Sequence, residues 1–305
     1  MDLINKFVSQ AKNLNKVFVF PEGEDERILK AVSLAVKQKI ITPILLGDEN
    51  KIKQKAKKHK IDFTNVQIIN PKNKLFHAAS MVAAGDADSF IAGTVYSSRE
   101  VIIASLKTIG LRKGVFIASS FFLMDIPNYL GGEKGNLIYS DASVNINPTA
   151  KELAEIAVMS GQTAKLLFDW EPRVALLSFS TKGSAKHPDV DKVALATKLA
   201  QKKAKGMNIE GELQVDAALI PEVAKRKVKG KTNGVPGRAN VLIFPNLDSG
   251  NIAYKLTQRL TNAKAYGPFL QGFNKPISDL SRGATVDDIF GVIVLLSIWS
   301  EKLKK

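Results

Sequence analysis

The feature that most constrains the fold is an alternation of short apolar runs rich in branched residues with longer segments of helical periodicity. The runs at 16–20, 42–48, 90–96 and 173–180 all have the composition of buried strands. Their alternation with helical segments is typical of βαβ units around a mostly parallel sheet. At 305 residues the chain is long enough for two ordinary domains. We therefore expect an α/β fold of two domains, with a hinge near residues 145–150.

Cysteine and histidine content limits the chemistry. The chain has no cysteine, which excludes disulfides, thiolate metal sites and a cysteine nucleophile. Its three histidines, His59, His77 and His187, are scattered without the spacing of metal ligands. We therefore expect no bound metal. A dinucleotide-binding GxGxxG fingerprint is also missing after every expected strand, which argues against hydride transfer of the usual kind.

The net charge of +15 raises the question of an acidic partner. The lysines concentrate at 51–60, 198–206 and 225–231, without the interleaved aromatic residues that stack on bases. Solvated helix faces are the simpler interpretation, so we expect no nucleic-acid partner.

Neither the opening residues nor the longest apolar run predicts a membrane or secretory segment. Residues 1–16 are polar and amphipathic, without the apolar core of a signal peptide. The run at 289–299 is well short of the roughly 20 residues that a membrane span needs, so a buried helix is expected there. A cytoplasmic protein with no membrane partner fits these features best.

Three helix starts can be predicted from capping residues. Asn147 precedes a proline and would cap the helix that follows it. Asp248 or Ser249 would cap the helix after 239–245. Thr285, followed three residues later by Asp288, matches a capping box with aspartate in place of the usual glutamate or glutamine.

The segments that follow strands are where ligands bind in open α/β sheets. The segment at 178–185 offers hydroxyls, a glycine and a lysine that suit a phosphate oxygen, although a simple polar turn explains it equally well. The residues concerned are Ser180, Thr181, Lys182, Gly183 and Ser184. Ser281 and Arg282 lie just before the Thr285 cap, near a helix N-terminus where anions collect. Arg259, on a helix, reads by itself as a surface residue.

Several motifs taken together resemble the phosphate acetyltransferases, which move an acetyl group between coenzyme A and inorganic phosphate. They run in order over nearly the whole chain: FPEGEDERILKAV, GDADSFIAGTVY, SDASVNINP, LSFSTKGSAKHP, GELQVDAALIP, NVLIFPNLDSGNIAYKLTQRL and AYGPFLQGFNKPISDLSRGATVDDI. The resemblance implies two α/β domains of the isocitrate/isopropylmalate dehydrogenase type with a cleft between them. Their expected bounds are 1–147 plus 271–305 for the first domain and 148–270 for the second.

The resemblance also implies roles for particular residues. Asp288 matches the family's catalytic base, and Ser281 and Arg282 match the pair beside the reacting thiol. The substrate-binding residues implied are Arg259, Ser180, Thr181, Lys182, Gly183, Ser184, Asn145 and Asn147. Acetyl-coenzyme A, phosphate and acetyl phosphate would be substrates, no cofactor would be tightly bound, and the protein would be a homodimer. We expect direct transfer in a ternary complex, because no residue looks poised as an acyl-accepting nucleophile.

The sequence departs from the family pattern at three places. Ile103 stands where many relatives have arginine, which leaves open whether Arg99 takes over that contact. The segment at 131–137 looks short, and Ala284 replaces a frequent cysteine. A butyryl or propionyl transferase and a non-catalytic homologue acting as a binding domain remain the alternatives.

Overall fold

The computed structural model describes residues 3–63, 66–230 and 232–304. Contacts between Cα atoms divide the chain into two compact units, one made of residues 1–114 and 266–305 and the other of residues 115–265. The first of these boundaries comes earlier in the chain than the hinge expected near 145–150. The physical reason is strand pairing: residues 136–140 form a strand that hydrogen-bonds to residues 241–243, deep inside the second unit.

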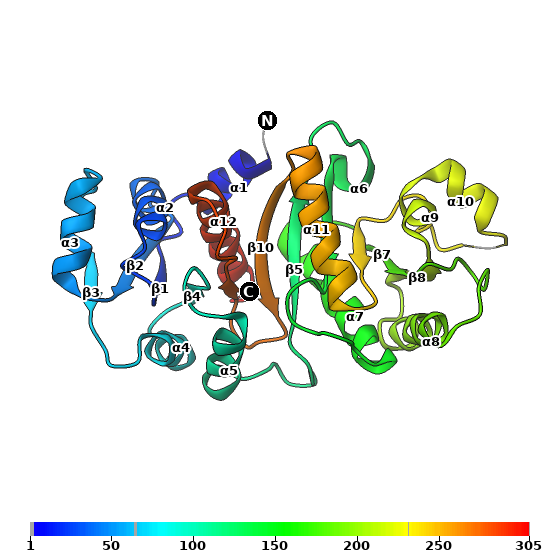
Figure 1. The fold of residues 1–305 in the computed structure, drawn as a ribbon, viewed down its shortest axis with the longest axis horizontal. Helices are drawn as coiled ribbons and strands as arrows, with labels where there is room; N and C mark the ends of the chain where they lie inside the picture. The colour runs from blue at the N-terminus through cyan, green and yellow to red at the C-terminus, as the bar shows by residue number, and fades with distance from the viewer. Residues whose placement is uncertain (1–2, 64–65, 231, 305) are drawn as a thin grey trace. The chain divides into compact units, whose positions relative to one another are not determined.

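The first unit has a six-stranded sheet in the order β3-β2-β1-β4-β11-β10. All described pairs are parallel except β10 with β11, which is antiparallel. Its elements, labelled in Figure 1, are α1 (Leu3–Ala11), β1 (Lys16–Phe20), α2 (Glu26–Lys37), β2 (Ile41–Leu46), α3 (Glu49–Lys58), β3 (Gln67–Ile69), α4 (Lys74–Ala84), β4 (Ser89–Ala92), α5 (Ser98–Thr108), β10 (Lys264–Gln271), β11 (Ile277–Asp279) and α12 (Val286–Lys302). The sheet is mostly parallel, as the alternation in the sequence predicts.

The apolar run at 289–299 forms most of α12, and this helix is the centre of the first unit's packing. Ile289 and every residue from Gly291 to Ser300 are buried. The helix packs against α1 and α2, beside which it lies in Figure 1. The expectation of a buried helix is therefore confirmed. Among the described residues, no helix is long and apolar enough to cross a membrane.

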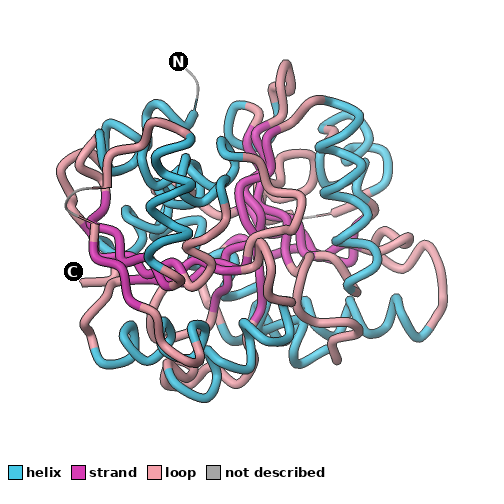
Figure 2. Tube along the Cα trace, turned by 60° about the vertical axis from the view of Figure 1, so that its left-hand side comes forward, coloured by secondary structure: helices cyan, strands magenta, loops and turns pink. Residues whose placement is uncertain are grey.

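The second unit has a five-stranded sheet in the order β5-β6-β9-β7-β8. Strands β6, β9, β7 and β8 are parallel, and β5 pairs antiparallel with β6. Its elements are β5 (Ser119–Asp125), α6 (Gly131–Lys134), β6 (Asn136–Ser140), α7 (Ala150–Phe168), β7 (Arg173–Leu177), α8 (Pro188–Lys203), β8 (Asn208–Leu213), α9 (Val215–Leu219), α10 (Pro221–Lys227), β9 (Val241–Ile243) and α11 (Leu247–Thr261). Strands and helices alternate along the chain here as well, and Figure 2 distinguishes them by colour.

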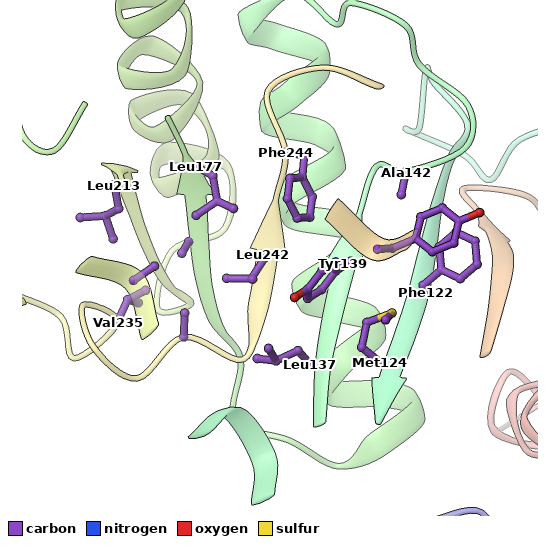
Figure 3. Packing of buried hydrophobic residues seen from close by; sticks show 14 of the residues in the cluster. Phe122, Met124, Leu137, Tyr139, Ala142, Leu177, Leu213, Val235, Leu242 and Phe244 are labelled. Carbon is purple, nitrogen blue, oxygen red and sulfur yellow. The ribbon is translucent and has the colours of Figure 1, made fainter. Parts of the chain in front are cut away.

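One face of this second sheet carries a continuous apolar cluster (Figure 3). Leu242 of β9 and Leu177 of β7 contribute buried side chains to it. Phe122 of β5 stacks on Tyr254 of α11 with ring centroids 4.0 Å apart and planes 19° apart. Burial of aromatic rings of this size dominates core energetics, so α11 is fixed to the sheet chiefly through Tyr254.

Two of the expected helix caps are wrong. Helix α7 begins after Thr149, not Asn147, because the Thr149 side chain and Glu152 form a complete capping box. Helix α11 is capped by Asn246, whose side chain accepts a hydrogen bond from the Ser249 backbone N–H at 2.9 Å. In both cases another side chain, two or three residues from the expected one, accepts a hydrogen bond from a free N–H group of the first turn.

Candidate active site

The segment Leu280–Asp288 follows β11 and leads into α12. Strand β11 is anchored to β4 up to its end, where the Leu280 N–H donates to the Ala92 carbonyl at 2.5 Å. The chain then makes a tight turn in which the Ala284 N–H donates to the Ser281 carbonyl at 2.9 Å. The side chains of Ser281 and Arg282 are exposed on this turn.

Asp288 occupies the first turn of α12. Its Oδ2 accepts hydrogen bonds from the Thr285 backbone N–H at 2.9 Å and from the Thr285 hydroxyl at 2.8 Å. The Thr285 hydroxyl in turn accepts from the Asp288 N–H, which completes the capping box predicted from the sequence. In the part of the chain that the structure describes, Asp288 Oδ1 has no such partner. The aspartate is therefore held through one carboxylate oxygen only.

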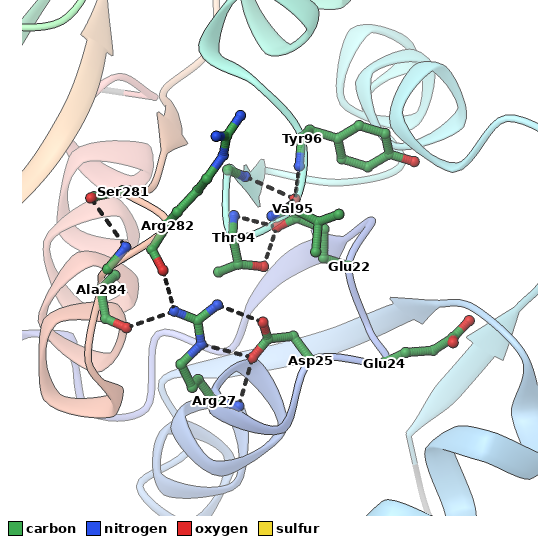
Figure 4. A network of polar contacts seen from close by, with 12 residues as sticks. Glu22, Glu24, Asp25, Arg27, Thr94, Val95, Tyr96, Ser281, Arg282 and Ala284 are labelled. Atoms are coloured by element: carbon green, nitrogen blue, oxygen red, sulfur yellow. Dashed lines mark hydrogen bonds and ion pairs between the residues drawn. The ribbon is translucent and has the colours of Figure 1, made fainter.

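Arg27 of α2 fixes the backbone of this turn, as Figure 4 shows. Its Nη1 donates to the carbonyls of Arg282 at 2.7 Å and Ala284 at 3.1 Å. Its Nε and Nη2 donate to the two oxygens of Asp25 at 3.1 and 2.7 Å. Burial alone would raise the pKa of Asp25, but Arg27 lowers that pKa below its ordinary value. The pair is thus a charged clamp on two carbonyls of the turn.

The Arg282 guanidinium takes no part in that clamp and extends away from it (Figure 4). Its positive charge reaches Glu100 in α5, the pKa of which is lowered first by hydrogen bonds from Ser97 and also by Arg282. Because only the carbonyl of Arg282 is held, its side chain remains available to a bound anion.

A second hydrogen-bond network joins Glu22, which follows β1, to the segment after β4. The Glu22 carboxylate, 6% exposed, accepts from four successive backbone N–H groups and one hydroxyl (Figure 4). The donors are the N–H groups of Gly93 at 3.2 Å, Thr94 at 2.8 Å, Val95 at 2.7 Å and Tyr96 at 2.7 Å, and the Thr94 hydroxyl at 2.6 Å. Such a run of N–H groups is an anion-binding nest, occupied here by the protein's own carboxylate.

Glu22, Asp25 and Arg27 were not predicted as site residues from the sequence, where 20–32 served only as one motif of the family resemblance. The signal was present, since these residues directly follow a buried strand, as ligand-binding segments do. A pocket of ≈ 380 Å³ is lined by Glu22 and Asp25 and also by Tyr96, Lys55 and Lys74. Both lysines hydrogen-bond to Glu24, Lys74 to its carboxylate and Lys55 to its carbonyl.

The residues expected to bind substrate lie in the second unit, where Asp141 organises the first group of them. Asp141 is 2% exposed and accepts from Ser120, from the N–H groups of Ser143, Val144 and Asn145, and from the Asn145 amide. The Asn145 amide also donates to the Ala118 carbonyl at 2.9 Å. Burial raises the pKa of Asp141, and these hydrogen bonds oppose the shift. Asn147 accepts from Lys192 at 2.8 Å.

The segment 178–185 follows β7, and its donors are already bound to acceptors of the same unit. Lys182 pairs with Glu210 and donates to the Gly211 carbonyl at 2.9 Å. The Gly183 N–H donates to Glu212 at 2.6 Å, and the Ser180 hydroxyl donates to the same oxygen at 3.1 Å. The Thr181 N–H donates to the Ser184 hydroxyl at 3.0 Å. An anion would have to displace these partners, so binding here stays a prediction.

Arg259 lies in the last turn of α11 and is exposed. The structure thus brings Ser281, Arg282 and Asp288 together in the first unit and places the other candidates in the second. Among the described residues, no group of three His, Asp or Glu side chains is placed to hold a metal ion.

Comparison with known proteins decides the family. The sequence profile described as phosphate acetyl/butaryl transferase matches residues 2–78 and 72–297. The chain belongs to this family. A phosphate acetyltransferase of Acetivibrio thermocellus is 39% identical over 335 aligned positions that cover 100% of both chains. One from Thermoanaerobacterium thermosaccharolyticum is 40% identical, covering 99% of this chain and 100% of its own length.

A solved phosphotransacetylase structure from Streptococcus pyogenes matches this member of the phosphate acetyl/butaryl transferase family with a TM-score of 0.90. The two chains are 35% identical, and the match covers 98% of each. The α/β fold predicted from the motifs is therefore confirmed, as is the family.

Proposed function

We propose that this enzyme transfers the acetyl group directly between acetyl-coenzyme A and phosphate within one ternary complex, using the segment Ser281–Asp288. That the chain is a phosphate acetyltransferase follows from its family and its full-length relatives. The observation that supports the site is the way this segment is held. Its backbone is bound by neighbouring groups while Ser281, Arg282 and Asp288 Oδ1 are left for a substrate.

In the proposed step, Asp288 takes the proton of the coenzyme A thiol as the sulfur attacks the carbonyl carbon of acetyl phosphate, and the bond from that carbon to the phosphate oxygen then breaks so that phosphate leaves. For an ordinary thiol and an ordinary aspartate this proton transfer is unfavourable by about 4.6 pKa units, or roughly 6 kcal/mol. A nearby positive charge reduces that gap by stabilising the thiolate. Arg282, whose guanidinium is not used by the clamp, supplies this charge. In the reverse direction a phosphate oxygen attacks the thioester, and Asp288 returns the proton to the leaving sulfur.

Arg282 has a second role in the proposal. Attack on the acetyl carbonyl gives a tetrahedral centre with negative charge on oxygen, and a guanidinium fixed beside it stabilises the transition state more than the ground state. Ser281 would donate its hydroxyl to the same region. Its Oγ accepts from the Gly283 N–H at 3.3 Å, which orients the oxygen without using its proton.

The proposal extends to substrate binding, location and assembly. The enzyme would take coenzyme A only as a substrate, and its substrate-binding residues would be Arg259, Asn145, Asn147 and residues 180–184. It would work in the cytoplasm as a homodimer. An apolar stripe on α11 supports self-association, since Ile252, Leu256 and Leu260 recur every four residues and are 55%, 52% and 78% exposed.

The decisive experiment is phosphate-dependent release of free thiol from acetyl-coenzyme A. We expect rapid release by the wild type and a loss of at least about a hundredfold in kcat for Asp288→Asn, with circular dichroism unchanged. Asp287→Asn is the matched control, because Asp287 is an exposed carboxylate in the same helical turn. A fully active Asp288→Asn enzyme would reduce Asp288 to a helix cap.

The family description covers butyryl as well as acetyl transfer, so acyl-chain length needs its own test. One methylene changes selectivity by about 1 to 3 kcal/mol in a hydrophobic pocket. We expect kcat/KM for acetyl-coenzyme A to exceed that for butyryl-coenzyme A. No release from either substrate would favour a non-catalytic binding domain.

A further inference from the structure

Asp279 is the last residue of β11, directly before the segment that carries Ser281 and Arg282. It is 1% exposed and lies opposite Ala92 of β4 in the parallel ladder. Among the described residues, neither of its carboxyl oxygens has a hydrogen-bond partner. Nearby Glu22 is also buried, at 6% exposed, but accepts five hydrogen bonds. A buried carboxyl without donors is rare enough to require an explanation.

The carboxyl is enclosed by a close approach of two backbone segments. Gly93 has φ of +108°, and a Cβ built on it would lie 2.7 Å from Asp279 Oδ1 and would collide with the backbone of Leu280. Only glycine therefore fits at this position. The Leu280 N–H is bonded to the Ala92 carbonyl on the other side. Hydrating the Asp279 carboxyl would require Leu280 to move away from Gly93, and Ser281 would move with it.

The charges around this carboxyl do not favour its ionised form. From the segment after β1, Glu22 presents a negative charge, and from α5, Ser98 presents a hydroxyl. Arg27 of α2 is committed to Asp25 and two carbonyls, and Arg282 acts on Glu100.

Burial, with a smaller addition from Glu22, raises the pKa of Asp279 to about 7. Ser98 opposes this rise, but no hydrogen bond of normal geometry joins it to Asp279.

We propose that Asp279 is a positioning residue for Ser281 and Arg282. While its carboxyl is neutral, Leu280 stays packed against Gly93 and holds Ser281 and Arg282 in place; when the carboxyl ionises, this packing opens and the two residues are displaced. A carboxylate that is buried without protein donors is strongly disfavoured, and in this proposal Gly93 and Leu280 separate so that water reaches it. Asp279 acts through Ser281 and Arg282 and touches no reacting atom. The inference rests on the proposed function of that segment.

Asp279→Asn tests this directly, because asparagine has the shape of the neutral acid and cannot ionise. The readout is the ratio of kcat for Asp279→Asn to kcat for the wild type, measured by thiol release from about pH 6 to about pH 8.5. Titration of the substrates cancels in this ratio. We expect the ratio to be constant below about pH 7 and to rise up to about tenfold per pH unit above it.

Asp88→Asn is the control, since Asp88 precedes β4 at the opposite end of the same sheet. Asp88 is bound by the Val17 N–H and by Lys304. Burial would raise the pKa of Asp88, but these two partners lower it. The ratio for Asp88→Asn should therefore be flat. A flat ratio for Asp279→Asn as well would overturn the proposal, as would a uniform loss of activity at every pH.

A measurement without turnover keeps the two hypotheses apart. Hydrogen exchange of the Ser281–Ala284 amides, measured relative to an unstructured peptide of the same sequence to remove the intrinsic effect of pH, should accelerate above about pH 7 in the wild type and in Asp88→Asn but not in Asp279→Asn. An inactive wild type that shows this acceleration would disprove the proposed function but support the role of Asp279. If the wild type is active but its amides exchange as they do in Asp279→Asn, the proposed function is supported and the role of Asp279 is disproved.

Discussion

The segments 280–288 in the first unit and 178–185 in the second both follow a parallel strand, and both combine hydroxyls, a glycine and a basic residue. They differ in which of their groups are already bound. In the first, Arg27 binds the backbone carbonyls and the side chain of Arg282 is left exposed. In the second, Glu210 and Glu212 bind Lys182 and Gly183. The same residue types after a strand can therefore have their donors bound within the protein in one segment and exposed in another, so residue type alone does not predict unpaired donors.

The largest expected effect concerns the free energy of unfolding and the buried carboxyl under the first segment. Below about pH 4 Asp279 is protonated in both the folded and the unfolded states and contributes nothing. Between about pH 4 and about pH 7 only the unfolded state loses the proton, because burial raises the folded-state pKa to about 7. Wild-type stability should therefore fall with rising pH relative to Asp279→Asn, by about 1.4 kcal/mol per pH unit and about 4 kcal/mol in all.

Urea unfolding followed by circular dichroism at several pH values would measure this difference. Above about pH 7 the difference should be constant. If the free energies of the two proteins run parallel from acid to neutral pH, the carboxyl is ionised in the folded state, and the first segment is not held in the way described.

The next largest effect is expected from removing Arg27, whose side chain binds the backbone of the first segment. Arg27→Ala removes the hydrogen bonds to the carbonyls of Arg282 and Ala284. Misplacing a catalytic group by about 1 Å can cost about a hundredfold, so we expect a fall in kcat of that order with a smaller change in KM. Arg27→Lys keeps the charge but cannot bind Asp25 and two carbonyls at once. Its kcat should therefore lie between those of the wild type and Arg27→Ala. Unchanged kcat in Arg27→Ala would show that the turn holds itself.

Much of this fold could be read from the sequence because its signals are local. The strand at 16–20 and the Thr285–Asp288 capping box depend on residues a few positions apart, and both were found where predicted. Strand β11 has only three residues and is defined by pairing with β10, just before it in the chain, and with β4, which lies far away in the chain. No window of sequence around it carries that information.

The same limit applies to the site. Ser281, Arg282 and Asp288 are close in sequence, and a resemblance to a known family identified them together. Arg27 and Glu22 lie more than 250 residues earlier, and their contacts exist only after β1, β4 and β11 have paired. In residues 180–184 the hydrogen-bond donors could be recognised from the sequence. The carboxylates that bind them lie on β8, and the pairing of β8 with β7 was not predicted.

A smaller effect concerns the cap that holds Asp288. Thr285→Ala removes the hydroxyl that donates to Asp288 Oδ2 and accepts from its N–H. Loss of such a cap costs about 1 kcal/mol, so thermal unfolding should shift by a few degrees at most. Thr285→Ser should restore both hydrogen bonds. If Thr285→Ala loses far more activity than stability, the hydroxyl also orients Asp288 for proton transfer.

The smallest expected effect concerns Lys182 in the segment 178–185 and the KM for phosphate. Lys182 is paired with Glu210 in a partly exposed ion pair, an interaction worth at most about 1 kcal/mol. If its ammonium is engaged there, Lys182→Met should change KM for phosphate by less than about fivefold. A lysine that bound phosphate through a charged hydrogen bond would contribute about 1.5 to 3 kcal/mol, and its loss would raise KM by at least about tenfold.

Glu210→Gln separates the cases further, because it frees Lys182 without removing it. A lower KM in Glu210→Gln, together with a raised KM in Lys182→Met, would show that phosphate displaces the carboxylate, and the two segments would then differ in their resting partner rather than in function.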